Sequence, residues 1–355
     1  MTRISALLLL PAALALAGCE TLSYYAQAVG GHLDLTGRAR PVAELVADAQ
    51  TPPSLRERLA LSQSVREFAS RELKLPDNGS FRRYTELERP YAVWNVVATP
   101  EFSLAPVRSC FPVAGCVSYR GFFSREGARR HAARQRARGY DAFVYGVPAY
   151  STLGLFDDPL LSTFIRWPEV ELAGLMFHEL AHQLVYVSGD STFNESFAVT
   201  VEREGVRRWL AASGRQADLE KFREARERER KFGQLLDDAR TRLEALYRLD
   251  LAAEAMRERK KAEFERLAAQ LGSESNFAAK IDSDPNFANF VPNNALLAAF
   301  ETYSQLVPAF ERLLAENGGD LNRFYAAVKS LAKLDKAERE RRLQGQESGM
   351  STTLR

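Results

Sequence analysis

With 355 residues, of which 46% are hydrophobic, the chain is long enough to bury one large core or two modest ones. Its 48 Lys and Arg residues nearly balance its 46 Asp and Glu residues, which leaves a formal net charge of +2. Such a balance creates no overall field that would attract nucleic acid. The composition therefore predicts a globular protein without a nucleic-acid partner.

Residues 1–18 have the pattern of a secretory signal peptide, because a basic start, an apolar run over 4–17 and small residues lead up to Cys19. The run is shorter than the roughly 20 apolar residues that a spanning helix needs. Leu-Ala-Gly-Cys resembles a bacterial lipobox, which implies that Cys19 carries lipid and anchors the mature chain in a membrane. By the same resemblance, Glu20 implies the cell envelope, at the outer membrane facing the periplasm. The alternative is a buried N-terminal helix.

After Cys19, the residue composition and the spacing of apolar residues change several times along the sequence. Residues 19–40 are interpreted as a tether, and 41–335 as a folded domain. Helical spacing of apolar residues predicts two helices within 41–75. Residues rich in β-branched and aromatic side chains predict strands near 91–98, 116–123 and 142–147, with a basic helix at 125–138.

Cys110 and Cys116 are the two cysteines left if Cys19 is lipidated. An exported compartment is oxidising enough to join them, and Pro112 and Gly115 suit the tight reversal of so small a ring. A local disulfide is therefore expected. The alternatives are two buried free thiols or, less favourably, a metal pair, because no histidine lies nearby in the sequence.

The most informative stretch is His-Glu-Leu-Ala-His at residues 178–182, in a helix predicted from Pro168 to about Val187. Histidines four residues apart project from one helix face and can both bind a tetrahedral Zn²⁺ ion. Glu179 lies beside them, where it can take a proton from bound water. The alternative is a buried structural pair of histidines, His178 and His182.

A catalytic zinc needs a third protein ligand, for which Glu195 is the candidate. Twelve residues separate it from His182, and Gly189-Asp190-Ser191 predicts a turn that brings a second helix back, with Asn194 capping or orienting it. The rivals are weaker: Glu202 shares the helix face of Glu195 but lies about 10 Å farther along, which suits an outer position or the surface. Glu204, on the same predicted helix, is a further alternative for the third ligand. His32 and His131 are poor candidates, because both are expected at the surface.

Residues beyond 215 are predominantly helical in pattern. A heptad-like spacing predicts a hairpin arm over about 215–272, and residues 336–355 are predicted to be a disordered tail. The fold class expected is thus α+β and helix-rich, with a small mixed sheet and a long C-terminal helical region.

The order His-Glu-x-x-His then Asn-Glu-x-x-Ala resembles the gluzincin metallopeptidases, a group that includes thermolysin and aminopeptidase N. More closely, the chain looks like a family of bacterial proteins described as putative aminopeptidases. The stretches that carry this resemblance are the lipobox and residues 110–116, 150–154, 156–160, 178–182, 193–198, 204–209 and 292–295. It implies a zincin-like fold, Zn²⁺ as cofactor and a peptide or protein as substrate. It also implies a distant tyrosine as oxyanion donor, for which Tyr303 is the candidate.

The function expected is thus hydrolysis of peptides, through Glu179-assisted attack of water, by an aminopeptidase. An aminopeptidase also needs a carboxylate for the substrate's ammonium group. The candidates flank the metal helix: Asp157, Asp158, Glu169 and Glu171. Residues 150–154 are expected to form an edge strand for the substrate backbone. Two other classes remain open: an inactive metal-binding envelope lipoprotein, and an assembly factor that uses the helical arm.

Overall fold

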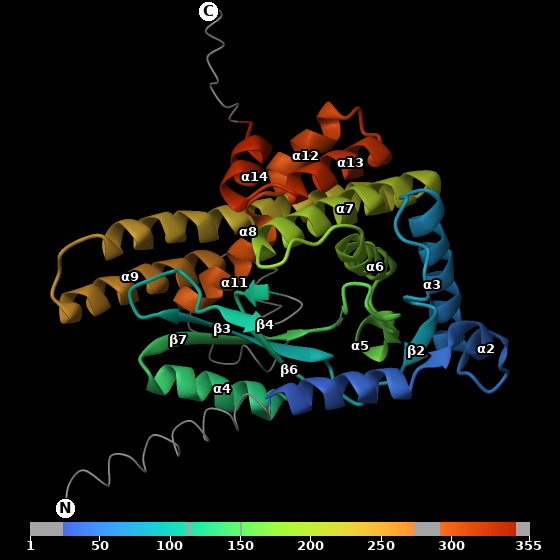
Figure 1. The fold of residues 1–355 in the computed structure, drawn as a ribbon, viewed down its shortest axis with the longest axis horizontal. Helices are drawn as coiled ribbons and strands as arrows, with labels where there is room; N and C mark the ends of the chain where they lie inside the picture. Colours follow the sequence, from blue (N-terminus) through green and yellow to red (C-terminus); the bar gives the residue numbers. More distant parts are fainter. Residues whose placement is uncertain (1–23, 112–114, 150, 273–291, 346–355) are drawn as a thin grey trace, which may run out of the picture.

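The computed structural model describes residues 24–111, 115–149, 151–272 and 292–345, and of residues 301–304 only the backbone. In these ranges small sheets lie beside a larger helical region, and a two-helix arm projects to one side (Figure 1). The α+β, helix-rich class that the sequence predicted is therefore confirmed. Within the described ranges, none of the helices combines the length and the apolar composition of a membrane-spanning segment.

The central sheet has the strand order β6-β3-β7, with antiparallel pairs throughout. Its strands are β3 (Val93–Pro100), β6 (Arg120–Phe122) and β7 (Tyr140–Val147). One face packs on α4 (Arg125–Ala137), and the other on α11 (Asn294–Ser304). Because helices cover both faces, β3 is buried along nearly its whole length, which explains its continuous apolar run.

A second small sheet has the order β1-β2-β8 and combines an antiparallel with a parallel pair. Its strands and adjacent helices are β1 (Arg40–Pro41), β2 (Arg83–Thr85), β8 (Leu160–Leu161), α2 (Val42–Ala47), α3 (Pro53–Arg71) and α5 (Ser162–Ile165). Residues 24–37 also form a helix, where the sequence predicted a tether. Leu35 of that helix is 1% exposed in the main core, so this segment belongs to the fold.

Helices α6 (Glu169–Leu184) and α7 (Ser191–Ala212) form the closely packed pair that carries the site. A Cβ atom on Gly205 of α7 would lie 2.7 Å from the ring of Phe177. A Cβ atom on Gly174 of α6 would lie 3.3 Å from the side chain of Glu202. The two glycines therefore allow the approach that brings carboxylates of α7 to the histidines of α6.

The arm predicted near 215–272 consists of α8 (Gln216–Tyr247) and α9 (Ala253–Gly272). Its two helices bury leucines and Phe264 against each other in a core separate from the main one. Charged residues line its outer surface in pairs, such as Arg230 with Glu227 at 2.6 Å. The helical spacing of apolar residues thus corresponds to the buried seam of the hairpin.

Three short helices complete the described chain: α12 (Val307–Glu316), α13 (Leu321–Ala332) and α14 (Lys336–Leu343). Residues 336–343 are therefore helical, where the sequence predicted the start of a disordered tail. The reason is a buried ion pair, because Arg339 and Asp190 are 4% and 3% exposed and lie 2.6 Å apart. Asp190 also caps α7, so α14 is fastened to the start of that helix.

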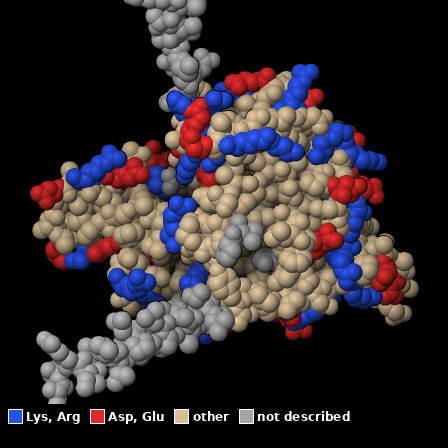
Figure 2. All heavy atoms as spheres, viewed as in Figure 1, with Lys and Arg blue, Asp and Glu red and all other residues tan. Residues whose placement is uncertain are grey.

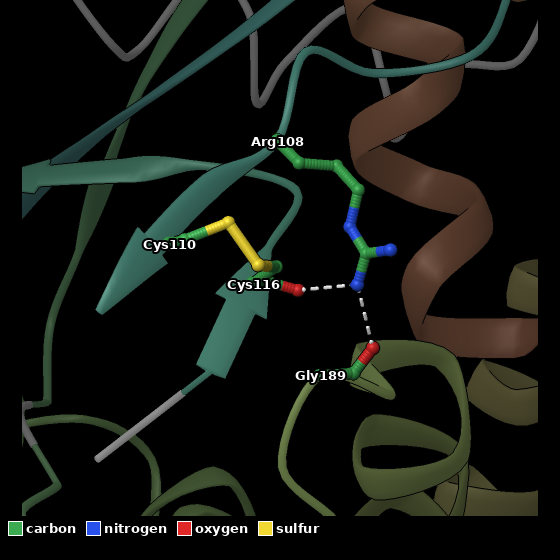
Figure 3. Close-up of a disulfide and its surroundings, with 4 residues drawn as sticks. All are labelled: Arg108, Cys110, Cys116 and Gly189. Atoms are coloured by element: carbon green, nitrogen blue, oxygen red, sulfur yellow. Dashed lines mark hydrogen bonds between the residues drawn. A yellow bond between two sulfur atoms is a disulfide. The ribbon is translucent and has the colours of Figure 1, made fainter. Parts of the chain in front are cut away.

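A disulfide between Cys110 and Cys116 joins β4 (Ser109–Phe111) to β5 (Gly115–Val117), as the sequence predicted. The hairpin is also attached to the turn before α7 (Figure 3). The Arg108 guanidinium donates hydrogen bonds to the carbonyl oxygens of Cys116, at 2.8 Å, and Gly189, at 3.0 Å. Arg108 therefore links this hairpin to the turn between the two site helices.

Candidate metal centre

His178 and His182 lie one turn apart in the C-terminal half of α6. Their Nε2 atoms are 3.2 Å apart, and the two rings meet edge to face. The helix is held in the main core because Leu180, on the opposite side, and the neighbouring Ala181 are fully buried. Helical geometry and core packing together aim both imidazoles toward α7.

Glu195, the predicted third ligand, approaches both histidines from α7. Its Oε2 atom lies 3.3 Å from Nε2 of His178 and 3.6 Å from Nε2 of His182. Asn194 fixes the turn before it, since its side chain bonds both the N–H and the carbonyl of Val187 at 2.8 Å. The capping role suggested for Asn194 belongs to Asp190, whose carboxylate accepts from the Phe193 N–H.

The three atoms suit a zinc ion by distance as well as by chemistry. Zinc bonds to nitrogen and oxygen are about 2.1 Å long, so the edges of its tetrahedron are about 3.4 Å. The separations of 3.2, 3.3 and 3.6 Å between the two Nε2 atoms and Oε2 match those edges. Among the described residues, His178, His182 and Glu195 are the group of His, Cys, Asp and Glu that could hold a metal ion.

Glu202 of α7 contacts His178 on the ring nitrogen that faces away from Glu195. Its Oε2 atom lies 3.2 Å from Nδ1 of His178, so a proton on Nδ1 would leave Nε2 free to bind a metal. Burial lowers the pKa of His178, but Glu195 and Glu202 raise it by more, so the pKa lies well above its usual value. Burial alone would raise the pKa of Glu202, but the hydrogen bond and charge of His178 lower it by more, so this pKa lies below its usual value. The cluster thus favours bound positive charge, whether proton or metal.

Glu179, the predicted base, faces a turn formed by residues 151–158. Burial raises its pKa, while the two histidines and a hydrogen bond from Ser151 oppose that shift. The same turn holds Asp158, whose carboxylate accepts from the Thr152 N–H at 3.0 Å. Burial is also the main cause that raises the pKa of Asp158 to about 6. A carboxylate with a raised pKa accepts a proton more readily near neutral pH, which suits a general base.

A cavity of about 880 Å³ surrounds this cluster. Tyr119, from the chain just before β6, and Tyr186, just after α6, line it together with Glu179 and Glu195. Burial, followed by the charge of Glu195, raises the pKa of both tyrosines, so their hydroxyls remain protonated donors. Sequence reasoning missed both. Only Tyr186 gave a signal, because it lies four residues after His182.

Other predicted residues lie elsewhere or outside the described residues. Cys19 lies outside them, and Tyr303 lies on α11, where only the backbone is described. Glu204 pairs with Arg207 and Arg208 instead of approaching the histidines. The rival carboxylate is thus neutralised on its own helix.

The surface position predicted for His131 is wrong. It is 8% exposed, lies 3.2 Å from Gln135 and packs against the ring of Phe122. The reason is that this side of α4 covers the central sheet. His32 is partly buried, and its ring contacts that of Phe156. It does not belong to the group of described residues that could hold a metal ion.

The edge strand predicted at 150–154 is not what the described residues 151–154 form. They make a turn in which Leu153 and Gly154 have positive φ angles of 58° and 81°. Among the carboxylates suggested for an ammonium group, Glu169 pairs with Arg215 at 2.8 Å. Glu171 remains available, because it is exposed and lines the cavity.

The chain is thus a helix-rich α+β protein in which a His-His-Glu group that could hold a metal ion lines a cavity. Residues 23–343 match the family described as "Putative aminopeptidase", and the chain belongs to that family. No curated protein matches the chain, and no solved structure matches it.

Proposed function

We propose that this chain is a zinc-dependent aminopeptidase with a zincin-like arrangement of its site. The observation that carries the proposal is the convergence of His178, His182 and Glu195 at tetrahedral spacing, with Glu179 beside them. When bound there, zinc supplies a Lewis acid that acidifies water and polarises a carbonyl group. Membership of the aminopeptidase family supports a peptide as substrate.

The chain's own residues then have distinct tasks. Glu179 accepts the proton of the attacking water, and its raised pKa makes it a better base. Ser151 lies close enough to Glu179 to lower its pKa and so opposes the effect of burial. Glu202 holds the ring of His178 in the tautomer that leaves Nε2 free. Each task follows from a contact within the cluster rather than from the sequence motif alone.

Negative charge that develops on the substrate carbonyl needs a hydrogen-bond donor. Tyr119 and Tyr186 are the donors proposed, because both line the cavity near Glu195 and keep their protons. Tyr303 remains the alternative suggested by the family resemblance. Replacing each tyrosine by phenylalanine in turn distinguishes them, because loss of the true donor should lower kcat by about 100-fold or more.

Glu171 is proposed to bind the substrate's ammonium group, because it lines the cavity from α6, is not the proposed base, and has no arginine or lysine pair among the described residues. An exopeptidase that uses it cleaves an amino-acyl amide but not its N-acetylated counterpart, and Glu171→Gln erases that preference. Equal cleavage of both substrates by the native protein would instead indicate an endopeptidase. It would leave the role of Glu179 intact.

Export and a lipid anchor on Cys19, at the outer membrane facing the periplasm, form the second part of the proposal. They follow from the signal-like residues 1–18 and the small residues before Cys19. Mass spectrometry of protein from the envelope measures this directly. A mature chain that begins at Cys19 and carries acyl groups is the expected result, and an unmodified Cys19 would contradict it.

The deciding experiment measures peptide hydrolysis by the Cys19→Ser protein with a chelator and after zinc is restored. We expect activity to disappear and return. Glu179→Gln should keep metal content while kcat falls by about 10²- to 10⁴-fold, because only the base is lost. Metal binding without any hydrolysis by the native chain would point instead to the metal-binding lipoprotein without activity. Hydrolysis that survives in Glu179→Gln would remove the assigned base.

A further inference from the structure

Most of the exposed large hydrophobic side chains of the described residues gather in two neighbouring segments. Five of the seven belong to the helix at 24–37 or to the turn at 151–156. They are Tyr25, Val29, Leu33, Leu155 and Phe156, and the last four are 58–63% exposed. Scattered exposed leucines are ordinary in proteins, but a concentration of this kind calls for an explanation.

The three helix residues form one stripe, because they follow each other at intervals of four. The other side of the same helix is fastened to the protein. There Gln27 accepts from the Phe123 N–H at 2.9 Å, and Tyr24 and Ala28 line the cavity. The helix is therefore held on one side and apolar on the solvent side.

The turn at 151–156 joins this stripe. The ring of Phe156 lies 4.8 Å from that of His32, which is next to Leu33 in the helix. We call the exposed surface of Tyr25, Val29, Leu33, Leu155 and Phe156 the apolar face. Neither 24–33 nor 151–156 contains an Asp, Glu, Lys or Arg residue, so the apolar face itself carries no charged side chain, and Asp34 and Asp157 lie at its border.

The position of the helix in the chain indicates what covers the apolar face. Residue 24 follows Cys19 by five residues, which span at most about 18 Å when fully extended. Lipid inserted from Cys19 would therefore hold the start of the helix within that distance of a bilayer. An uncharged, tyrosine-bearing helix face so close to lipid suits the boundary between headgroups and acyl chains.

We propose that the apolar face docks on the surface of the bilayer that carries the lipid anchor. The proposal rests on the lipidation of Cys19 proposed above. Docking adds a second point of contact to a single anchor, and so fixes the orientation of the protein as well as its location.

The docked orientation has a consequence for the cavity. Tyr24, Ala28 and Leu153 line it from the same two segments that carry the apolar face. Ser151, which lines the cavity with the proposed base Glu179, belongs to the same turn. The wall of the cavity thus lies directly behind the lipid-facing side chains, which places peptide hydrolysis next to the membrane surface.

Fluorescence quenching by brominated lipid tests this docking. Phe156→Trp and, separately, Leu155→Trp place a reporter on the apolar face, and Leu249→Trp places one at an exposed leucine between α8 and α9. Lipidated protein is bound to vesicles of phosphatidylethanolamine and phosphatidylglycerol with brominated acyl chains, and the signal of the three native tryptophans is subtracted. We expect quenching of both turn reporters and none of the Leu249→Trp reporter.

Membrane-bound protein in which neither turn reporter is quenched would overturn docking while leaving the anchor intact. If mass spectrometry finds no lipid on Cys19, the anchor fails instead. The Cys19→Ser protein, which lacks any anchor, then measures docking alone. Its vesicle binding should fall at least tenfold when Val29→Asp and Leu33→Asp are added, because the two apolar side chains that would enter the lipid are replaced by charged ones. A dimer that dissociates with these substitutions, without vesicle binding, would assign the apolar face to a second copy.

Discussion

The helix pair α6–α7 and the arm α8–α9 are both helical hairpins that carry charged residues, yet they use them in opposite ways. In the arm, Glu227 pairs with Arg230 on an exposed surface, with the two side chains 50% and 57% exposed. In the site pair, Glu195 is 14% exposed and its partners are two imidazoles. Space-filling atoms show charges dotted along the projecting arm (Figure 2).

This contrast separates charges that keep a helix soluble from charges that create a site. Exposed pairs three or four residues apart contribute little to stability, because water screens them. Buried carboxylates are costly unless hydrogen-bonded and matched by positive charge. Hydrogen bonds and positive charge from His178 and His182 outweigh the cost of burying Glu195, and those from His178 do the same for Glu202. Substitutions in the two hairpins should differ accordingly.

The largest effect is expected from Glu195→Ala. Removing a direct ligand should lower zinc affinity by more than the 10- to 100-fold that an outer partner typically contributes. Zinc content after dialysis against a competing chelator measures this. Glu204→Ala serves as the matched control on the same helix, because Glu204 pairs with arginines. Equal losses in the two variants would remove Glu195 from the ligand set.

A large effect on stability is expected from Asp190→Asn, which leaves the buried Arg339 without a counter-charge. Breaking such a pair costs about 3–5 kcal/mol in free energy of unfolding. Urea unfolding measures it. The double variant Asp190→Asn with Arg339→Met should recover part of the loss, because no buried charge is left. No change in either variant would mean that α14 is not fastened to α7 in solution.

A smaller effect is expected from Glu202→Gln. The amide can still accept from Nδ1 of His178 but contributes no negative charge, so zinc affinity should fall by about 10- to 100-fold. Turnover at saturating zinc should change much less than in Glu179→Gln. A loss of kcat at full zinc occupancy as great as that of Glu179→Gln would instead make Glu202 part of the chemistry.

The smallest effect is expected from Glu227→Gln in the arm. It removes one exposed ion pair, so the free energy of unfolding should change by less than about 1 kcal/mol, and less again in high salt. Zinc affinity should not change. A larger shift in stability would show that the arm's charges form a network.

The pattern of neighbouring residues in the sequence was sufficient to predict several elements of the fold. The strands near 91–98 and 142–147, the helix from Pro168 and the disulfide were predicted, because each depends on neighbours in sequence. The turn at 151–154 was not, because its conformation depends on contacts with Asp158, which is 3% exposed in the core. Burial of that carboxylate has no signature in a single sequence.

The site shows the same division. The spacing of His178 and His182 alone determined that two imidazoles share one helix face, since the α-helix repeats every 3.6 residues. Whether Glu195, Glu202 or Glu204 meets them was decided by how closely α6 and α7 approach, which Gly174 and Gly205 permit.

Tertiary structure alone brought Tyr119 to the cavity and fastened α14 to α7 through Arg339. Tyr119 and His178, which line the same cavity, are 59 positions apart in the sequence, and Asp190 and Arg339 are 149 apart. The formation of such contacts depends on the packing of the whole chain, whereas a metal-binding spacing depends on one turn of one helix. The sequence by itself therefore determined the reactive pair of histidines, and the fold decided which carboxylates and hydroxyls surround it.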